Sequence, residues 1–204
     1  REHFQLNMDI IGEESVLADA DLLAAALEVL KMLGLSAGDV VARISDRRLL
    51  HAALLELGVT EATLPVAYNV IDKVERDSRD VSIKRLVEIG LTPEQAEEAL
   101  GMTSLGIEEI RTRFAGSEAI AETLRSLESY FDALRALGFG DWVRFDMKIV
   151  RGLAYYTGIV FEIFDRKGEL RAICGGGRYD RLFTTLTGID VPALGFGFGD
   201  VVLG

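Results

Sequence analysis

The sequence predicts an α+β fold in which helices pack on one face of an antiparallel sheet and a helical segment is inserted into the chain. Three observations indicate this fold. Residues 1–11 alternate as a half-buried strand does, residues 15–33 and 117–137 carry apolar side chains at helical spacing, and several strands follow one another after Trp142. Strands joined by short links pair antiparallel, whereas a doubly wound parallel sheet needs a crossover helix between its strands.

The first strand carries polar and apolar side chains on opposite faces. Its apolar face holds Phe4, Leu6, Met8 and Ile10, and its polar face holds Arg1, His3, Gln5, Asn7 and Asp9. A solvent-facing strand edge is the simpler interpretation, but glutamine, asparagine and aspartate are poor strand formers. The mixture therefore also fits a strand face whose side chains hydrogen-bond a ligand.

Three further elements complete the first part of the chain, which we assign to residues 1–59. They are a helix from Ser15 to Leu33 that ends at Gly34, a strand over 40–44, and a helix that Asp46 caps and that runs to about Leu57.

Residues 60–115 differ from the rest of the chain because they are rich in Glu, Lys and Arg and show no strand periodicity. Thr92, Pro93 and Gln95 form a capping-box start with proline at the first helical position. We expect this stretch to be a small helical insertion.

The last part, residues 116–204, opens with an amphipathic helix that Ser117 caps and Gly138 ends. Strands are expected at 142–150, 157–164, 170–174 and 193–199, and the turn 165–168 should join the second and third of these as a hairpin.

Composition limits the possible functions. The net charge is 22 − 33 = −11, which argues against binding nucleic acid through a general basic surface but leaves local contacts with RNA open. A single cysteine, Cys174, allows no intrachain disulfide and fits a reducing compartment, and with only two histidines a Cys/His zinc site is not expected. No apolar run approaches the roughly 18 residues that span a bilayer. Because Arg1 opens directly into a patterned segment with no signal peptide, we expect a piece of a longer polypeptide.

Two glycine-rich segments and one arginine are candidates for chemistry. Three glycines in CGGGRYD (174–180), between a strand and a helix, would let a ligand approach the backbone closely, although the segment has neither the Walker ending nor the dinucleotide spacing. The glycines of GFGFG (195–199) would weaken a strand unless something must lie against it. Arg151, in RGLAYYTG (151–158), lies between two apolar strands, where an arginine needs an anionic partner or contact with solvent. Both a structural arginine and one that binds a ligand meet this requirement. With the polar strand, these segments predict a broad, flat ligand platform on the sheet.

In their order and spacing these segments resemble the class II aminoacyl-tRNA synthetases, and in particular the histidyl-tRNA synthetase family. The opening REHFQLNMDIIG resembles the second strand of motif 2, and RGLAYYTGIVFE (151–162) resembles the family's histidine signature, usually written RGLDYYTGTVFE. CGGGRYD matches the second segment of the histidine pocket, and ALGFGFGD (193–200) falls where motif 3 begins. The resemblance extends over nearly the whole chain but does not include motif 1, the first strand of motif 2 or an anticodon-binding domain.

The resemblance implies an enzyme that activates histidine with ATP to histidyl-adenylate and transfers the histidyl group to the 3′ end of tRNA(His). Arg151 would be the catalytic residue. Histidine would be bound by Gln5, Asp9, Tyr155, Tyr156, Tyr179, Gly175 and Gly177. ATP, accompanied by Mg²⁺, would contact Arg1, His3, Gly195, Gly197 and Gly199, and no protein-bound structural metal is expected. The resemblance also implies a cytoplasmic homodimer without membrane association.

Three residues depart from the family pattern. Ala154 replaces the aspartate of the signature, Asp9 stands where the family usually has glutamate, and Val202 stands about where motif 3 carries a phosphate-binding arginine. The valine favours a non-catalytic, histidine-binding protein resembling the regulatory subunit of ATP phosphoribosyltransferase, whereas Arg151 favours the enzyme. An interaction domain that kept the fold and lost both ligands is the third possibility. This stretch of chain alone is not expected to aminoacylate tRNA.

Overall fold

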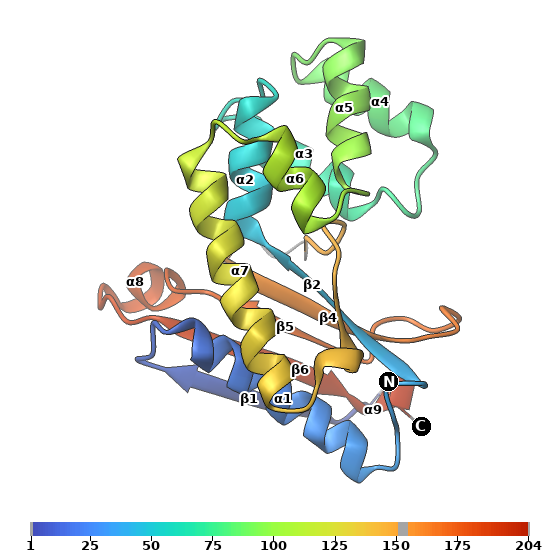
Figure 1. Cartoon of the computed structure of the whole chain (residues 1–204), viewed down its shortest axis with the longest axis vertical. Coiled ribbons are helices and arrows are strands. Elements are labelled where there is room, and N and C mark those ends of the chain that lie inside the picture. Colours follow the sequence, from blue (N-terminus) through green and yellow to red (C-terminus); the bar gives the residue numbers. More distant parts are fainter. Residues whose placement is uncertain (1, 151–154, 204) are drawn as a thin grey trace.

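The computed structural model describes residues 2–150 and 155–203, and its centre is a six-stranded sheet with helices against one face (Figure 1). The strand order across the sheet is β1-β6-β5-β4-β2-β3. The α+β class predicted from the sequence is therefore confirmed. The strands are β1 (Gln5–Ile11), β2 (Val40–Asp46), β3 (Val143–Phe145), β4 (Ile159–Asp165), β5 (Cys174–Arg178) and β6 (Ala193–Gly199).

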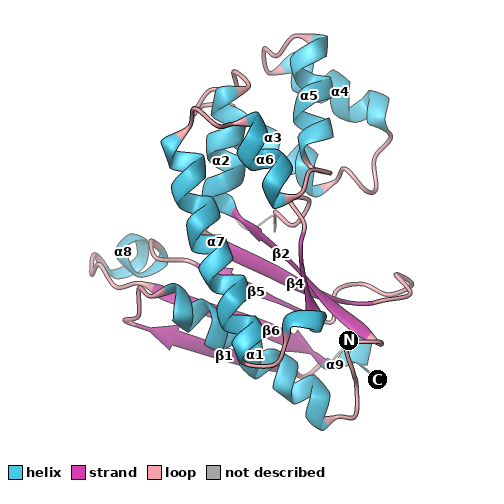
Figure 2. Cartoon of the chain, viewed as in Figure 1, coloured by secondary structure: helices cyan, strands magenta, loops and turns pink. Residues whose placement is uncertain are grey.

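Two long helices, α1 and α7, lie side by side across the same face of the sheet (Figure 2). Within the described ranges no helix combines the length and the apolar character needed to cross a bilayer. The helices are α1 (Val16–Met32), α2 (Arg47–Glu56), α3 (Leu64–Asp72), α4 (Arg79–Glu88), α5 (Pro93–Met102), α6 (Ile107–Arg113), α7 (Glu118–Ala136), the 3-10 helix η1 (Gly140–Trp142), α8 (Leu182–Thr187) and α9 (Asp200–Leu203).

The expected helix starts are those of the structure, although Ser117 stands at the start of α7 without the side-chain hydrogen bond of a cap. The Ser15 side chain accepts a hydrogen bond from the backbone N–H of Leu17, and Asp46 caps α2 by accepting from Arg48 N–H at 2.8 Å. Both halves of the capping box between Thr92 and Gln95 are present. These local signals identify the starts of three helices because each cap satisfies a backbone donor that the helix itself leaves open.

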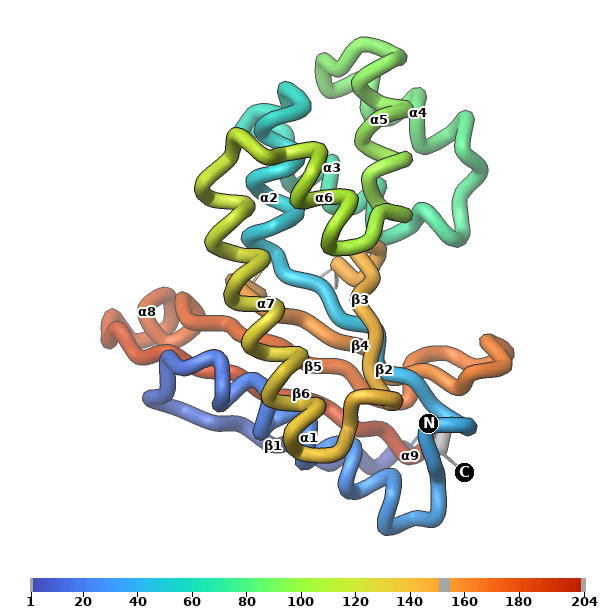
Figure 3. The backbone as a smooth tube through the Cα atoms, viewed as in Figure 1, coloured from blue at the N-terminus to red at the C-terminus, as the bar shows by residue number. Residues whose placement is uncertain are grey.

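Residues 60–115, all of them described, contain helices α3 to α6 and no strand. They gather at one end of the molecule, above the end of the sheet where α2 begins (Figure 3). The expected helical character of this stretch is confirmed, while its status as an insertion stays a prediction.

The core lies between the sheet and the two long helices. Phe161 and Ile163 of β4, Leu27 of α1 and Leu127 of α7 are at most 1% exposed, and all belong to one apolar cluster. Burying a side chain of this kind stabilises a fold by about 1.5–3 kcal/mol. The middle of this face of the sheet is therefore filled by packing against the helices.

Three strands differ from their predictions. In β1 the apolar face that the alternation predicted to be buried is exposed, since Leu6 is 51% and Met8 is 38% exposed. Of the strand expected at 142–150 only Val143–Phe145 forms, and it pairs with β2 in parallel because the long helical connection between them acts as a crossover. Beyond Phe145 the chain turns away, since the Asp146 side chain accepts from Lys148 N–H at 3.1 Å and its carbonyl accepts from Ile149 N–H. The prediction of a strand over the whole segment was wrong.

The strand expected at 170–174 forms instead at Cys174–Arg178, so the three glycines are part of a central strand and not of a loop. The turn at 165–168 does form, because Gly168 N–H donates to Asp165 O, but a longer loop precedes β5. A β carbon at Gly176 would lie 2.7 Å from Phe196 Cβ and 2.9 Å from Phe161 Cζ. Glycine is required here because β5 is enclosed closely between β4 and β6.

Candidate functional site

The polar side chains of β1 lie across the glycines of β6. The antiparallel register places Gln5 opposite Gly199, and Asp9 opposite Gly195. A β carbon at Gly195 would lie 2.6 Å from the Tyr179 hydroxyl and would overlap the Asp9 carboxylate. The absence of a side chain on this face of β6 therefore makes the room that the β1 side chains occupy, which explains why glycine is present in a strand.

A cavity of about 610 Å³ opens on this face of the sheet, within the usual size range of a small-molecule site. It is lined by most of the residues that the sequence predicted for ligand binding: Gln5, Asp9, Tyr155, Tyr156, Gly175, Tyr179, Gly195, Gly197 and Gly199. The flat platform predicted from the sequence is thus a concave site bordered by three tyrosines.

Tyr179 and Asp9 form the central polar contact of the cavity. The Tyr179 hydroxyl donates a hydrogen bond to Asp9 Oδ1. Burial, together with the hydrogen bond and negative charge of Asp9, raises the pKa of Tyr179 well above its usual value near 10. Tyr179 is therefore a neutral donor at physiological pH and holds the carboxylate in place over Gly195.

Three tyrosine rings form one wall of the cavity. The ring centroids of Tyr155 and Tyr156 are 4.7 Å apart, and the Tyr155 and Tyr179 rings meet edge to face at 5.7 Å. Tyr156 is 6% exposed, whereas Tyr155 is 38% exposed at the mouth. The wall offers both π faces and hydroxyl groups, which suits a small aromatic ligand with polar ring atoms.

Two predicted site residues do not line the cavity, and two others, Arg1 and Arg151, lie outside the described residues. His3 is exposed ahead of β1 and does not line the cavity. A β carbon at Gly177 would lie 2.9 Å from Val160 Cγ1, so this glycine is required by strand packing and likewise does not line the cavity.

Sequence reasoning missed two features of the cavity wall. Asn7 lies between Gln5 and Asp9 on the polar face and accepts a hydrogen bond from Gln5 Nε2 at 2.6 Å. The alternation of polar and apolar side chains along β1 was enough to place Asn7 on this face. Val201 and Val202 of α9 also line the cavity, so apolar side chains stand where the family pattern has a phosphate-binding arginine.

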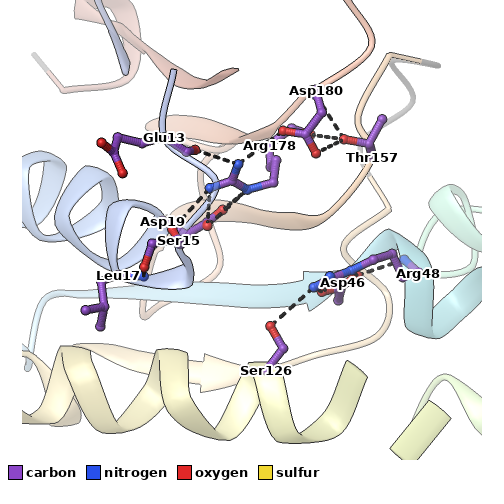
Figure 4. Close-up of polar contacts among 10 residues, drawn as sticks. All are labelled: Glu13, Ser15, Leu17, Asp19, Asp46, Arg48, Ser126, Thr157, Arg178 and Asp180. Carbon is purple, nitrogen blue, oxygen red and sulfur yellow. Dashed lines mark hydrogen bonds and ion pairs between the residues drawn. The ribbon is translucent and has the colours of Figure 1, made fainter. Parts of the chain in front are cut away.

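Arg178 fixes the strand end that carries Tyr179 (Figure 4). Its guanidinium is buried and donates to Asp19 Oδ2 of α1 at 2.6 Å, to Glu13 O at 2.9 Å and to Asp180 Oδ1 at 3.1 Å. Burial raises the pKa of Asp19, and the hydrogen bonds from Arg178 oppose that shift. The network joins β5 to the start of α1 and so holds Tyr179 from behind.

The same network reaches the tyrosine wall. Asp180 accepts a hydrogen bond from the Thr157 hydroxyl at 3.0 Å, and Thr157 N–H donates to Arg178 O at 2.8 Å. Thr157 follows Tyr156 directly. In the sequence, Arg178 stands out only as part of the segment CGGGRYD. Its structural role depends on Asp19 and Glu13, which lie far away in the chain, so no local pattern indicates it.

Metal binding has no obvious place in the described part of the chain. In residues 2–150 and 155–203 no group of three or more His, Cys, Asp or Glu side chains could hold a metal ion. Cys174 is buried under the cavity floor, consistent with the small buried thiol expected from the sequence.

A largely antiparallel sheet, covered by helices on one face and carrying an amino-acid-sized polar cavity on the other, is the class II synthetase-like fold that the sequence predicted. A family model described as histidyl-tRNA synthetase matches residues 1–199. The chain belongs to the histidyl-tRNA synthetase family.

Individual relatives agree with this family. The chain is 44% identical over 205 residues to the chloroplastic/mitochondrial histidine–tRNA ligase of Arabidopsis thaliana and 39% identical over 208 residues to the histidine–tRNA ligase of Opitutus terrae. Each match includes 100% of this chain, but only 41% and 48% of the relative's length. The chain thus spans less than half the length of these two relatives.

Solved structures share the fold. The crystal structure of histidyl-tRNA synthetase from Nostoc sp. PCC 7120 matches with a TM-score of 0.86 at 27% identity, over 98% of this chain and 49% of that one. A Bacillus halodurans structure, named as an ATP phosphoribosyltransferase regulatory subunit/histidyl-tRNA synthetase, matches with a TM-score of 0.80 at 25% identity, over 96% of this chain and 51% of that one.

Proposed function

We propose that this chain is part of the catalytic domain of a histidine–tRNA ligase, which forms histidyl-adenylate from histidine and ATP and then transfers the histidyl group to the 3′ end of tRNA(His). The observation that carries the proposal is the Asp9–Tyr179 pair above Gly195, in a cavity walled by tyrosines. A fixed carboxylate beside aromatic rings can accept a hydrogen bond from an imidazole N–H and pack against the ring.

The histidine ligand would be recognised from both ends. Asp9 would accept from one imidazole nitrogen and Tyr156 would bond the other, while Tyr179 closes the pocket. Gln5 would orient the α-amino or carboxylate group, and Gly175 would keep β5 free of a side chain beneath the ligand. The exposure of Tyr155 at the cavity mouth places it where the amino acid enters.

In the first step, a carboxylate oxygen of histidine would attack the α-phosphorus of ATP. The bond to pyrophosphate breaks, and pyrophosphate carries away its electron pair. Arg151 would stabilise the charge that develops on the α-phosphate, an electrostatic role that needs no proton transfer. In the second step, the terminal ribose hydroxyl of the tRNA attacks the histidyl carbonyl and AMP leaves.

ATP would lie along β1 and β6, where Gly195, Gly197 and Gly199 leave the backbone uncovered. His3 would stack on adenine and Arg1 would bind phosphate, with Mg²⁺ accompanying the nucleotide. Val202 lines the cavity without a charge, so the phosphate contacts would come from other groups and from the metal.

A histidine-binding regulatory protein is the second candidate. Two observations favour it: the valines of α9 in the cavity, and the Bacillus halodurans structure whose name includes a regulatory subunit. Such a protein would keep Asp9, Tyr156 and Tyr179 for histidine but would need no group that stabilises a reacting phosphate. Among the named relatives, the histidine–tRNA ligases at up to 44% identity support the enzyme.

Histidine-dependent exchange of pyrophosphate into ATP distinguishes the two candidates. The full-length protein would be assayed with each of the twenty amino acids. Exchange with histidine alone is the expected result. Calorimetric binding of histidine without any exchange would refute the enzyme and support the regulatory protein.

Three further expectations accompany the proposal. The helical stretch 60–115 is proposed as an insertion between two parts of one catalytic domain, 1–59 and 116–204, and the full-length protein is proposed to be a homodimer. A cytoplasmic location stays a prediction, because the name of the Arabidopsis relative places that protein in chloroplasts and mitochondria.

A further inference from the structure

Tyr155 and Tyr156 stand between two cavities. One is the 610 Å³ cavity described above, and the other, of about 880 Å³, has both tyrosines in its lining together with Arg47, His51 and Tyr68. Tyr156 is 6% exposed and packs in one apolar cluster with Ile149, so its place is set by the side chains it packs on. The position of this tyrosine wall therefore depends on how the backbone of those neighbours is held.

Arg47, the first residue of α2, contacts the backbone on both sides of the wall. Its N–H donates to Gly158 O at 2.9 Å, and its Nη1 donates to Val150 O at 3.2 Å. The residue before Val150, Ile149, packs in one apolar cluster with Tyr156. A single arginine thus holds Gly158 with its main chain and, with its side chain, the segment on which Tyr156 packs.

The Arg47 guanidinium is itself oriented by α3. Its central carbon lies 4.0 Å from the centroid of the Tyr68 ring, a cation–π distance. The Tyr68 hydroxyl hydrogen-bonds His51 Nδ1 at 3.0 Å. Burial lowers the pKa of Arg47, and the negative charge of Asp72 opposes that shift, so the guanidinium stays protonated at neutral pH.

We propose that Arg47 is a positioning residue for the amino-acid pocket: stacked on Tyr68, it fixes the backbone at Val150 and, through Ile149, the place of Tyr156. Arg47 is not among the described residues that line the 610 Å³ cavity, so its effect on the ligand is indirect. The inference rests on the proposed function for the identity of the ligand as histidine. It also implies that α3, in the stretch 60–115, influences amino-acid affinity from outside the pocket.

The test uses the full-length protein and four variants, Arg47→Ala, Arg47→Lys, Tyr68→Leu and Arg48→Ala. Arg47→Ala is expected to raise the KM for histidine about tenfold in pyrophosphate exchange, because a charged hydrogen bond that holds the wall is lost. The KM for ATP should change much less. Arg47→Lys keeps the charge and should recover part of the histidine affinity, and Tyr68→Leu should show a smaller rise in the same KM.

Arg48→Ala is the matched control. Arg48 is the next residue of α2, is half exposed and also lines the 880 Å³ cavity, but its guanidinium pairs with Asp46 Oδ2 at 2.6 Å. This variant should leave the KM for histidine unchanged. Thermal melting of all variants separates positioning from general destabilisation, which would lower the melting temperature and the active fraction without a selective effect on histidine.

Two results would overturn the inference. The first is an unchanged KM for histidine in Arg47→Ala and Tyr68→Leu, and the second is an equal rise for histidine and ATP. If Arg47→Ala does not fold, the lysine and Tyr68 variants decide. The wild type is measured first. If it binds histidine without catalysing exchange, the proposed enzyme is refuted, and the inference about Arg47 is tested through the Kd for histidine. If it does not bind histidine at all, the proposed function and the inference are both refuted.

Discussion

Gly195→Ala should weaken histidine binding by about 10- to 150-fold. The added methyl group would lie 2.6 Å from the Tyr179 hydroxyl and overlap the Asp9 carboxylate. These two groups can make room only by breaking their hydrogen bond, and a hydrogen bond to a charged group contributes about 1.5–3 kcal/mol. Each 1.4 kcal/mol corresponds to a tenfold change in affinity, which gives the expected range.

The stability of the same variant should change less than its affinity. Crowding a packed site costs about 1–3 kcal/mol, and replacing glycine by alanine returns about 0.4–1 kcal/mol by restricting the unfolded chain. The free energy of unfolding should therefore fall by between almost nothing and roughly 2.5 kcal/mol. Urea denaturation measures this loss, and calorimetric titration with histidine measures the affinity.

Gly199→Ala is the matched control for histidine affinity, measured without ATP. Gly199 lies on the same face of β6 and lines the same cavity, but among the described residues, its chain neighbours aside, no heavy atom lies within 4 Å of the position its β carbon would take. Its affinity for histidine should stay close to that of the wild type. Equal histidine affinities for the two alanine variants would show that the Asp9–Tyr179 pair does not bind the amino acid.

Three further predictions concern the arginine and two of the tyrosines. Arg151→Ala should slow adenylate formation by orders of magnitude while histidine affinity falls less, because a transition-state contact is lost. Rapid-quench kinetics measure the rate and calorimetry measures the affinity, and equal losses in both would contradict a catalytic role for Arg151. Tyr156→Phe should weaken histidine binding by about 1–3 kcal/mol through an unpaired imidazole nitrogen, and unchanged affinity in calorimetry would show that the pocket is wrongly assigned. Burial and Asp9 raise the pKa of Tyr179, so the folded protein keeps a proton that the unfolded chain releases, and stability falls as the pH rises above about 10. Tyr179→Phe should therefore lose less free energy of unfolding than the wild type between about pH 9 and about pH 11 in urea titrations, and parallel losses would contradict the shifted pKa.

Local signals predicted the helix starts well and the strand bounds less well. Ser15, Asp46 and Thr92 cap helices where their sequence patterns indicated, because a cap involves only neighbouring residues. The bounds of β5 depend on distant pairing partners, whereas the end of β3 depends on a local turn that the alternation did not indicate. Asp146 ends β3 through contacts with its own turn, and Gly176 belongs to a strand because β4 and β6 enclose it.

The site was predictable where it follows strand alternation and not where it depends on tertiary contacts. Gln5 and Asp9 were identified from one polar face, and the same alternation pointed to Asn7. The contacts of Arg178 with Asp19 and of Arg47 with Val150 join residues more than one hundred positions apart. No spacing rule indicates such partners, so the residues that hold the site in place emerge only from the fold.

The glycines of β6 show how one pattern can serve both the fold and the site. Phe196 and Phe198 alternate with Gly195 and Gly197, so the aromatic face anchors the strand in the core while the other face has no side chains. A strand of low intrinsic propensity is thereby held by its buried face and by its pairing with β1 and β5 on either side. Because β6 contributes no side chain to the cavity floor, the polar groups there come from β1, which lies across it, and Asp9 reaches Tyr179 directly over Gly195. The conflict between glycine content and strand formation is therefore the sequence feature that indicates where the cavity lies.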